Sequence, residues 1–487
     1  MNMNEALSAL DFGSVNSESE EDLDRLFVRT TDFDKFLKKN VWITLGAKGT
    51  GKSALFELFT KFEESTRRMS GDSLQKTIIA AGTGFGDLSE IATGDLQHLK
   101  DGAENYDHDR MWRLYIAVKA GLAVGAAGLK VRRGPLRQLL TGIGEKRDFR
   151  VGPLLKELWT LAIGTAPSEV TVSTGGASLK LNGGKGTLDT VTLLQDVHAA
   201  LVDSDASLWL MFDKVDELWP SDRNERKKSI EGLMTACMHI RRTFPAIQPK
   251  VFLRTDLWGE LDFTNKDHLT DKRIELNWTT AHLSSLLLKR ATKNDAVMQC
   301  ICARHAELDG RPVDTWTPDE KLAALQVVFP ATAYPGDREA AIVDWLVERV
   351  RDGRGTVLPR DAIVLANSAA DLQREVGSMD SGTLIGREAI RQAFTRTSQI
   401  RCESYLAEFP DLREHFRRFS GQTTSEFSRQ ELLDLMGGLS PLGDELLERL
   451  FEIGVLRPDS GRVVTARSYE VPRLYRTGLG LVIRGRP

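Results

Sequence analysis

Four short apolar runs in the first 255 residues of the chain are bounded by charged or glycine-rich segments. They are 41–45, 77–82, 208–212 and 251–253. Runs of this length without alternation are typical of strands buried on both faces of a parallel sheet. The segment that follows the first run has a helical pattern. We therefore predict an α/β fold, a parallel sheet with flanking helices.

A long insertion, about residues 83–190, separates the second and third runs. Within it, 169–173 and 177–181 flank a Gly-Gly pair, which is a strong hairpin signal. The weakly polar stretch 114–129 contains Lys119 and is too short to cross a membrane, so we expect a packed helix there.

The second half of the chain begins helical and ends differently. Residues 427–438 and 441–450 predict two helices, and 453–457 with 462–464 predict strand, turn, strand. This order is typical of a winged helix. We predict four parts: a helical lead-in (1–40), a core (41–280), a helical lid (281–370) and a C-terminal domain with a winged helix (371–487).

Residues 46–53 form a complete G-x-x-x-x-G-K-[ST] phosphate loop between a predicted strand and a predicted helix. The glycines let backbone N–H groups surround phosphates, and the helix N-terminus adds positive potential. Lys52 would reach the β- and γ-phosphates, and the Ser53 hydroxyl would bind Mg²⁺. The predicted cofactors are ATP and Mg²⁺, with nucleotide contacts from Gly46, Lys48, Gly49, Thr50, Gly51, Lys52 and Ser53.

Acidic residues follow the third apolar run, where ligands bind in open α/β sheets. Asp213 is the candidate Mg²⁺ ligand, and Glu217 the candidate for orienting or deprotonating the attacking water. Asp216 could share that second task. The alternative is an acidic surface turn after a core strand.

One arginine is a candidate to act on the γ-phosphate. Arg254 ends the fourth apolar run, and a cation there would stabilise the charge of the transferred phosphoryl group. The alternative is an arginine paired with Asp256. An arginine finger from a neighbouring subunit is a further option, with candidates Arg223, Arg226, Arg241 and Arg242.

The pattern Asp213-x-x-Asp216-Glu217, with Lys214 where many ATPases place the glutamate, resembles the STAND ATPases, including the NACHT and KAP groups, within the AAA+-like division. The stretches 27–30, 250–257, 274–278 and 358–361 resemble a bacterial P-loop ATPase family often associated with phage-defence gene clusters. By this resemblance, Arg360 corresponds to the lid arginine that closes over nucleotide. Its alternative role is an ion pair with Asp361 at a helix start.

Composition fits a cytoplasmic protein without a membrane anchor. The chain has 487 residues, 41% hydrophobic content, a net charge of −4 and four cysteines that offer no disulfide framework. The N-terminus lacks the pattern of a signal peptide. Cys300, Cys302 and His305 are possible metal ligands, but zinc normally takes four, so buried thiols on a helix are preferred.

Two further segments are charged. The acidic lead-in 17–22 is expected to be solvated, or else Ser17 caps the next helix with Glu20 completing a capping box. From Arg457 to the end, seven arginines stand against two acids, which suits contact with a phosphate backbone. The winged helix could bind DNA through this segment or brace the nucleotide domain.

These features together predict an ATPase that acts as an oligomerising, nucleotide-controlled switch in antiphage defence. Its partners would be copies of itself, an effector protein from a neighbouring gene and, through the basic segment, DNA. Two alternatives stay open: a DNA-handling ATPase of transposition or repair, and a nucleotide-dependent scaffold with negligible turnover.

Overall fold

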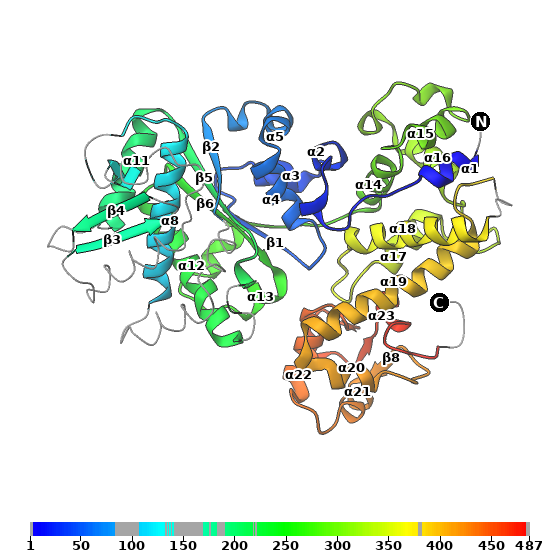
Figure 1. Ribbon diagram of the computed structural model, residues 1–487. Helices are drawn as coiled ribbons and strands as arrows, with labels where there is room; N and C mark the ends of the chain where they lie inside the picture. The colour runs from blue at the N-terminus through cyan, green and yellow to red at the C-terminus, as the bar shows by residue number, and fades with distance from the viewer. Residues whose placement is uncertain are drawn as a thin grey trace. The chain divides into compact units, whose positions relative to one another are not determined.

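The computed structural model describes residues 3–82, 107–131, 134, 136–137, 139–140, 169–174, 177–182, 190–217, 219, 222–377 and 382–483. The chain divides into two compact units (Figure 1). The sheet unit contains Thr31–Leu45 and Leu55–Glu275. The helical unit contains Met1–Thr30, Gly46–Ala54 and Leu276–Pro487. The phosphate loop is thus grouped with the second half of the chain.

A five-stranded sheet forms the centre of the sheet unit. Its strands are β1 (Ile43–Gly46), β2 (Thr77–Ala81), β5 (Ser207–Phe212), β6 (Ile247–Arg254) and β7 (Arg273–Glu275), in the order β2-β5-β6-β1-β7. The pairs β2–β5, β5–β6 and β1–β7 are parallel. The four apolar runs are therefore confirmed as strands of a parallel sheet, and β6 separates the phosphate-loop strand from the strand before Asp213.

Helices cover the sheet because its strands are apolar on both faces. The helices of this unit include α3 (Thr31–Phe36), α5 (Glu63–Ser70), α8 (His108–Ala126), α11 (Thr190–Asp203), α12 (Arg223–Thr243) and α13 (Thr255–Glu260), and α4 (Lys52–Lys61) follows the phosphate loop. Alternate residues of β5 point to opposite faces. Phe212 meets Trp112 of α8 at a ring distance of 6.0 Å, whereas Trp209 meets Phe36 of α3 at 5.7 Å.

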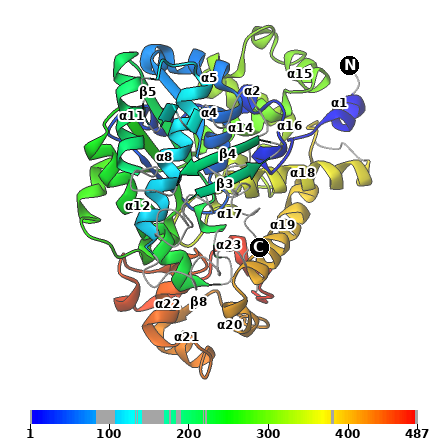
Figure 2. The ribbon, with the colours of Figure 1, turned by 60° about the vertical axis from the view of Figure 1, so that its left-hand side comes forward.

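The predicted packed helix in the insertion is α8, which is largely buried. The predicted hairpin is also present: β3 (Glu169–Thr174) pairs antiparallel with β4 (Ala177–Asn182) (Figure 2). Its Gly-Gly turn lies outside the described residues. Among the described residues, no helix is both long and apolar enough to cross a membrane.

A lysine lies fully buried at the centre of the sheet unit. The Lys250 amine donates to the carbonyl oxygens of Phe36 (2.7 Å) and Val41 (2.9 Å) and lies 3.7 Å from the ring centre of Trp209. Burial lowers the pKa of Lys250 well below its ordinary value because the charged form loses its hydration. The amine thus ties the end of α3 and the segment before β1 to the middle of β6.

Helices dominate the helical unit. They are α1 (Met3–Ala9), α2 (Leu23–Leu26), α14 (Thr280–Ala291), α15 (Asp295–Cys302), α16 (Pro318–Val328), α17 (Ile342–Arg349), α18 (Pro359–Val376) and α19 (Arg387–Glu408). Apart from α2, these helices share one apolar core, which also takes in Leu10, Phe12 and Val28 of the N-terminal part. The predicted lead-in (1–40) is therefore divided: its first 30 residues belong to the helical unit, and residues 31–40 belong to the sheet unit.

The acidic lead-in is solvated as expected except at Glu20, and the alternative capping box is not formed. Ser17 lies in a short 3₁₀ helix and caps nothing, and Asp22 precedes α2 without a side-chain cap. Glu20 is buried and accepts a hydrogen bond from Arg290 of α14 at 3.1 Å. Its neighbours Glu18 and Glu21 are exposed as expected. A buried arginine far along the chain needs this carboxylate, which local sequence patterns do not reveal.

The C-terminal part is a winged helix. Helix α20 (Arg413–Arg418) is followed by β8 (Glu426–Ser428), α21 (Arg429–Leu435), α22 (Gly443–Glu452), β9 (Arg457–Pro458), β10 (Ser468–Glu470) and α23 (Arg473–Arg476). The strands form an antiparallel sheet in the order β8-β10-β9. Both strands of the predicted hairpin were misplaced. Of the predicted strand 453–457, only Arg457 is in β9, and residues 463–465 form a 3₁₀ turn, so that the second strand comes later.

A buried aspartate stands where the loop before α18 meets the winged helix. One carboxylate oxygen of Asp352 accepts the backbone N–H groups of Arg354 (3.0 Å) and Thr356 (2.8 Å). The residue is 1% exposed, and burial raises its pKa to about 6. Gly454 packs so closely that an added Cβ would lie 2.9 Å from the other oxygen.

Candidate nucleotide-binding site

The phosphate loop takes the conformation that its glycines permit. Gly49 and Gly51 have φ angles of +90° and +96°, a region that residues with a Cβ rarely adopt. Helix α4 begins directly afterwards at Lys52. The N–H groups of its first turn have no partner within the helix, so they are available to an anion together with those of the loop.

Thr50 and Gly46 hold the loop in shape. The Thr50 hydroxyl donates to the Ala47 carbonyl at 2.8 Å, and the side chain is 1% exposed. An added Cβ on Gly46 would lie only 2.3 Å from that hydroxyl oxygen, so no larger residue fits there. Position 46 must therefore be glycine, because a side chain there would displace the Thr50 hydroxyl from its hydrogen bond with Ala47.

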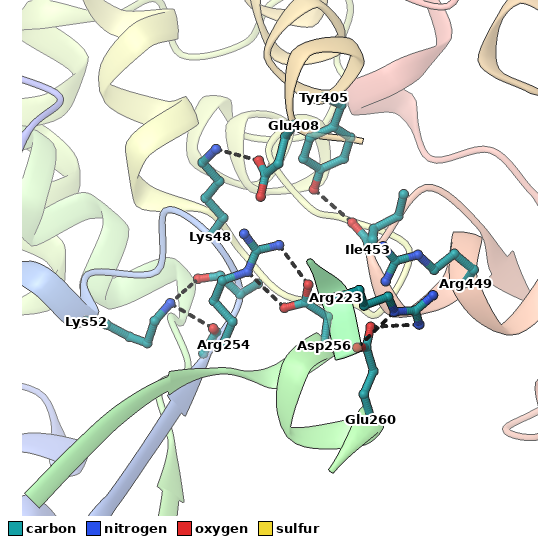
Figure 3. A network of polar contacts seen from close by, with 12 residues as sticks. Lys48, Lys52, Arg223, Arg254, Asp256, Glu260, Tyr405, Glu408, Arg449 and Ile453 are labelled. Atoms are coloured by element: carbon teal, nitrogen blue, oxygen red, sulfur yellow. Dashed lines mark hydrogen bonds and ion pairs between the residues drawn. The ribbon is translucent and has the colours of Figure 1, made fainter. Parts of the chain in front are cut away.

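The two residues predicted to reach phosphate and metal open helix α4. The Lys52 ammonium donates to the carbonyl oxygens of Gly46 (2.9 Å) and Ala47 (3.0 Å), which places its charge inside the loop (Figure 3). Ser53 is the second residue of the helix and is half-buried. Both side chains therefore lie at the loop that would bind the phosphates.

Two residues of the helical unit contact the outside of the loop. The Trp278 indole donates to the Thr50 carbonyl at 2.8 Å. The Arg360 backbone N–H donates to the Gly49 carbonyl at 3.3 Å, and an added Cβ on Gly49 would lie 3.0 Å from the Cβ of Arg360. Arg360 is thus next to the loop, and its role as a lid arginine over the nucleotide stays a prediction.

The alternative pairing of Arg360 with Asp361 is not observed. The buried Asp361 carboxylate instead lies 3.4 Å from the Arg401 guanidinium of α19, and burial raises the pKa of Asp361. No hydrogen bond to the Arg360 guanidinium is found within the described part of the chain. The Arg360 backbone is held at the start of α18 by its hydrogen bond to the Gly49 carbonyl.

Lys48 has an unexpected partner. Its ammonium forms an ion pair with the carboxylate of Glu408, the last residue of α19 (Figure 3). The two residues are 360 positions apart, and no sequence signal marks Glu408. Trp278 lay in a stretch that carried the family resemblance, but its bond to the loop was also missed.

The other predicted residues belong to the sheet unit. Asp213 is 4% exposed and directly follows β5, and Lys214 has a φ of +58°. This turn leads into a 3₁₀ helix, Val215–Glu217. Asp216 is half-buried and Glu217 is exposed. The strand end thus carries one buried acid followed by two more accessible ones, and their assignment to Mg²⁺ and to the attacking water stays a prediction.

Arg254 ends β6, the strand next to β5, and its guanidinium forms two hydrogen bonds with Asp256, at 3.0 and 2.7 Å. The alternative considered from the sequence is therefore present. This pairing holds the arginine at the carboxyl edge of the sheet and fixes its side-chain direction. A role for Arg254 toward phosphate stays a prediction.

The arginine-finger candidates differ in their surroundings. Arg223 pairs with Glu260 at 3.0 Å. Arg241 donates to the carbonyl oxygens of Pro249 (3.2 Å) and Lys39 (2.6 Å), and burial lowers its pKa to about 10. Arg241 thus supports the fold of the sheet unit. Arg226 is half-buried and Arg242 exposed.

The basic C-terminal segment is partly neutralised. Glu470 lies 3.5 Å from Arg457 and 2.6 Å from Arg476. Arg462 and Arg467, in the connection between β9 and β10, are exposed, as is Arg473. Arg484 and Arg486 lie outside the described residues. In the described ranges, no group of three or more His, Cys, Asp or Glu side chains could hold a metal ion.

The fold can be identified from three features: the strand order, the phosphate loop directly after β1, and Asp213 directly after β5. It is a P-loop NTPase fold with a C-terminal winged helix. No known protein-family model matches the sequence, and no curated protein sequence is significantly similar to it.

Several solved structures show distant similarity. The ORC2 protein of Aeropyrum pernix in its ADPNP-ADP complexes is 11% identical, with a TM-score of 0.36 and 92% of each chain covered. The ORC1 protein of the same organism in complex with DNA is 14% identical, with a TM-score of 0.33, covering 96% of this chain and 93% of that one. Cdc6p of Pyrobaculum aerophilum is 11% identical, with a TM-score of 0.28 and coverage of 96% and 95%. Similarity this distant does not transfer a function.

Proposed function

We propose that the chain binds and hydrolyses Mg-ATP and acts as a nucleotide-controlled switch. The observation that carries this proposal is the phosphate loop, in which two glycines with positive φ, a buried threonine lock and Lys52 stand at the start of α4. A glycine turn that only connects a strand to a helix would not require all three features at once. They form the phosphate cradle of a nucleotide site.

The residues divide the chemistry between them. Lys52 would bind the β- and γ-phosphates, and Ser53 with Asp213 would hold Mg²⁺. The bound cation would neutralise charge on the transferred phosphoryl group. Glu217 or Asp216 would orient the attacking water, and Arg254 and Arg360 would stabilise the γ-phosphate.

The assembly and its biological role rest on the motif resemblance. A STAND-like or AAA+-like ATPase would form homo-oligomers when ATP is bound, and hydrolysis would reset it. In antiphage defence, an effector protein in trans would carry out the destructive step. The defence role and the effector are part of the proposal and are supported by the motifs of residues 27–30, 213–217 and 358–361.

One observation favours a DNA-handling ATPase instead. Arg462 and Arg467 are exposed in the connection between β9 and β10, the part of a winged helix that projects from its sheet. Such residues can neutralise phosphates of a nucleic-acid backbone. DNA-stimulated hydrolysis would support this second function. A scaffold with negligible turnover, suggested by Lys214 in place of a glutamate, would bind ATP without hydrolysing it.

Three substitutions test the site. Lys52→Ala should weaken ATP binding roughly 10- to 100-fold, because it removes charged hydrogen bonds worth about 1.5–3 kcal/mol. Asp213→Ala should keep some nucleotide binding and lose Mg²⁺-dependent hydrolysis. Glu217→Gln should bind Mg-ATP and hydrolyse it slowly, because the amide keeps the shape and loses the basicity.

Matched controls are available on the same elements. Lys61 at the other end of α4 pairs with Glu57, and Asp205 is exposed before β5. Lys61→Ala and Asp205→Ala should bind and hydrolyse ATP like the unaltered chain. Isothermal titration measures binding, and phosphate release measures turnover. Unchanged ATP affinity in Lys52→Ala, with the unaltered chain binding ATP, would refute the assignment.

A further inference from the structure

One face of α19 connects three parts of the helical unit. Arg401, Tyr405 and Glu408 follow each other at intervals of four and three residues, so they lie on the same side of the helix. Arg401 contacts Asp361 at the start of α18, and the Tyr405 hydroxyl donates to the Ile453 carbonyl of the winged helix at 2.8 Å. Figure 2 shows α19 running from α18 to the winged helix.

Glu408 extends this face to the phosphate loop through Lys48. The Lys48 side chain is 33% exposed and that of Glu408 is 17% exposed, so the pair is partly shielded from solvent. Lys48 stands between Ala47, which packs against apolar residues of the end of α19 and the winged helix, and Gly49, which lies against Arg360. The pair therefore joins the loop that would hold the phosphates to the end of α19.

The charges determine how this pair responds to a ligand. Lys48 carries one positive charge, and the phosphates of a nucleotide and the Glu408 carboxylate are both anions that would attract it. A polyphosphate at the loop would also repel Glu408, because it has the same sign of charge. Phosphate binding and the Lys48–Glu408 pair therefore oppose each other.

We propose that Glu408 competes with the nucleotide phosphates for Lys48, so that nucleotide binding at the loop loosens the attachment of α19. This inference rests on the proposed function, because it requires nucleotide at the phosphate loop. Coupling of this kind is reciprocal: whatever holds α19 against the loop also weakens nucleotide binding. Through Arg401 and Tyr405, the same helix carries the change to α18 and to the winged helix.

The test compares nucleotide affinities of charge variants by isothermal titration with ATP and Mg²⁺. Glu408→Gln should bind ATP about two- to fivefold more tightly, the effect of losing one partly exposed ion pair. Glu403→Gln is the matched control, since Glu403 is exposed on the same helix five residues earlier. Its affinity should equal that of the unaltered chain.

A double substitution separates competition for Lys48 from simple repulsion of phosphate. In a Lys48→Ala background, Glu408→Gln should give a smaller gain than it gives when Lys48 is present. An equal gain in both backgrounds means that Glu408 only repels phosphate and overturns the proposal. Unchanged or weaker binding by Glu408→Gln overturns it as well.

Hydrogen exchange of α19 provides a second measurement. Saturating ATP should speed backbone amide exchange in residues 403–409 of the unaltered chain, and Glu408→Gln should exchange quickly with or without ATP. No ATP effect in the unaltered chain overturns the coupling. If the unaltered chain binds no ATP in the titration, the proposed function itself fails, whereas ATP binding with no effect of Glu408→Gln refutes this inference only.

Discussion

Asp352 should make the stability of the helical unit depend on pH. Its pKa is raised from 3.8 to about 6 because the carboxylate is buried, with only two backbone N–H groups and nearby arginines to offset the loss of hydration. The folded chain therefore holds the proton more tightly than the unfolded chain does. The stabilisation by this proton is complete below about pH 3.8 and is lost as the pH rises through 6.

The size of the effect follows from the two pKa values. Their difference, at about 1.4 kcal/mol for each pKa unit, corresponds to at most about 3 kcal/mol. Asp352→Asn keeps an oxygen for the two N–H groups and never ionises. The measured quantity is the free energy of unfolding of Asp352→Asn minus that of the unaltered chain. We expect this difference to rise by up to about 3 kcal/mol between pH 4 and 6.5 and then to stay level.

Urea unfolding followed by circular dichroism at half-unit pH steps measures this difference. Taking the difference between variant and unaltered chain cancels the titration of groups common to both. Asp309→Asn, at an exposed aspartate, is the control and should show no comparable rise. A flat difference between pH 4 and 6.5 for Asp352→Asn, or one that falls, would refute the reasoning.

Three more substitutions have defined outcomes. Lys250→Met should lower the free energy of unfolding by about 1–3 kcal/mol in a urea titration, because it leaves two carbonyl oxygens buried without donors; unchanged stability would contradict this. Gly49→Ala should weaken ATP binding in a calorimetric titration while the fold persists, since its φ of +90° and the nearby Arg360 leave no room for a Cβ; wild-type affinity would count against the loop geometry. If the winged helix binds DNA, replacing Arg462 and Arg467 together with Glu should weaken binding to unrelated sequences and reduce its salt dependence in filter binding; no salt-sensitive binding by the unaltered chain would instead favour bracing.

The sequence predicted the sheet well because its signals are local. Each apolar run is continuous and ends at charged residues, so the strands could be located, and the phosphate loop requires particular residues at fixed spacing. The helix–helix–hairpin order of the winged helix was predicted, but its strands were not located: β8 (Glu426–Ser428) was missed, the predicted strand 453–457 meets β9 only at Arg457, and the last strand was placed too early. Val463 and Val464 suggested a strand there, but the chain makes a 3₁₀ turn and pairs only from Ser468 onward.

The contacts between distant residues could not be predicted. Glu20 looked like part of a solvated acidic run until the structure placed it against Arg290, 270 residues later. Glu408 resembles other acids on exposed helices, and only the fold places it beside Lys48. The sequence around a charged residue does not tell whether it is solvated or forms a buried ion pair. The residue that pairs with it lies far away in the sequence and comes near only in the folded chain.

The strand order has a consequence for synthesis on the ribosome. Both neighbours of β1 in the sheet, β6 and β7, lie more than 200 residues later in the chain. At about 5–20 residues per second, the phosphate-loop strand would wait roughly 10–40 s for its first partner. During that time its apolar edge has no strand to pair with, so the nascent chain should depend on holding chaperones. For the same reason, a fragment that ends before Arg254 should fail to fold its nucleotide site.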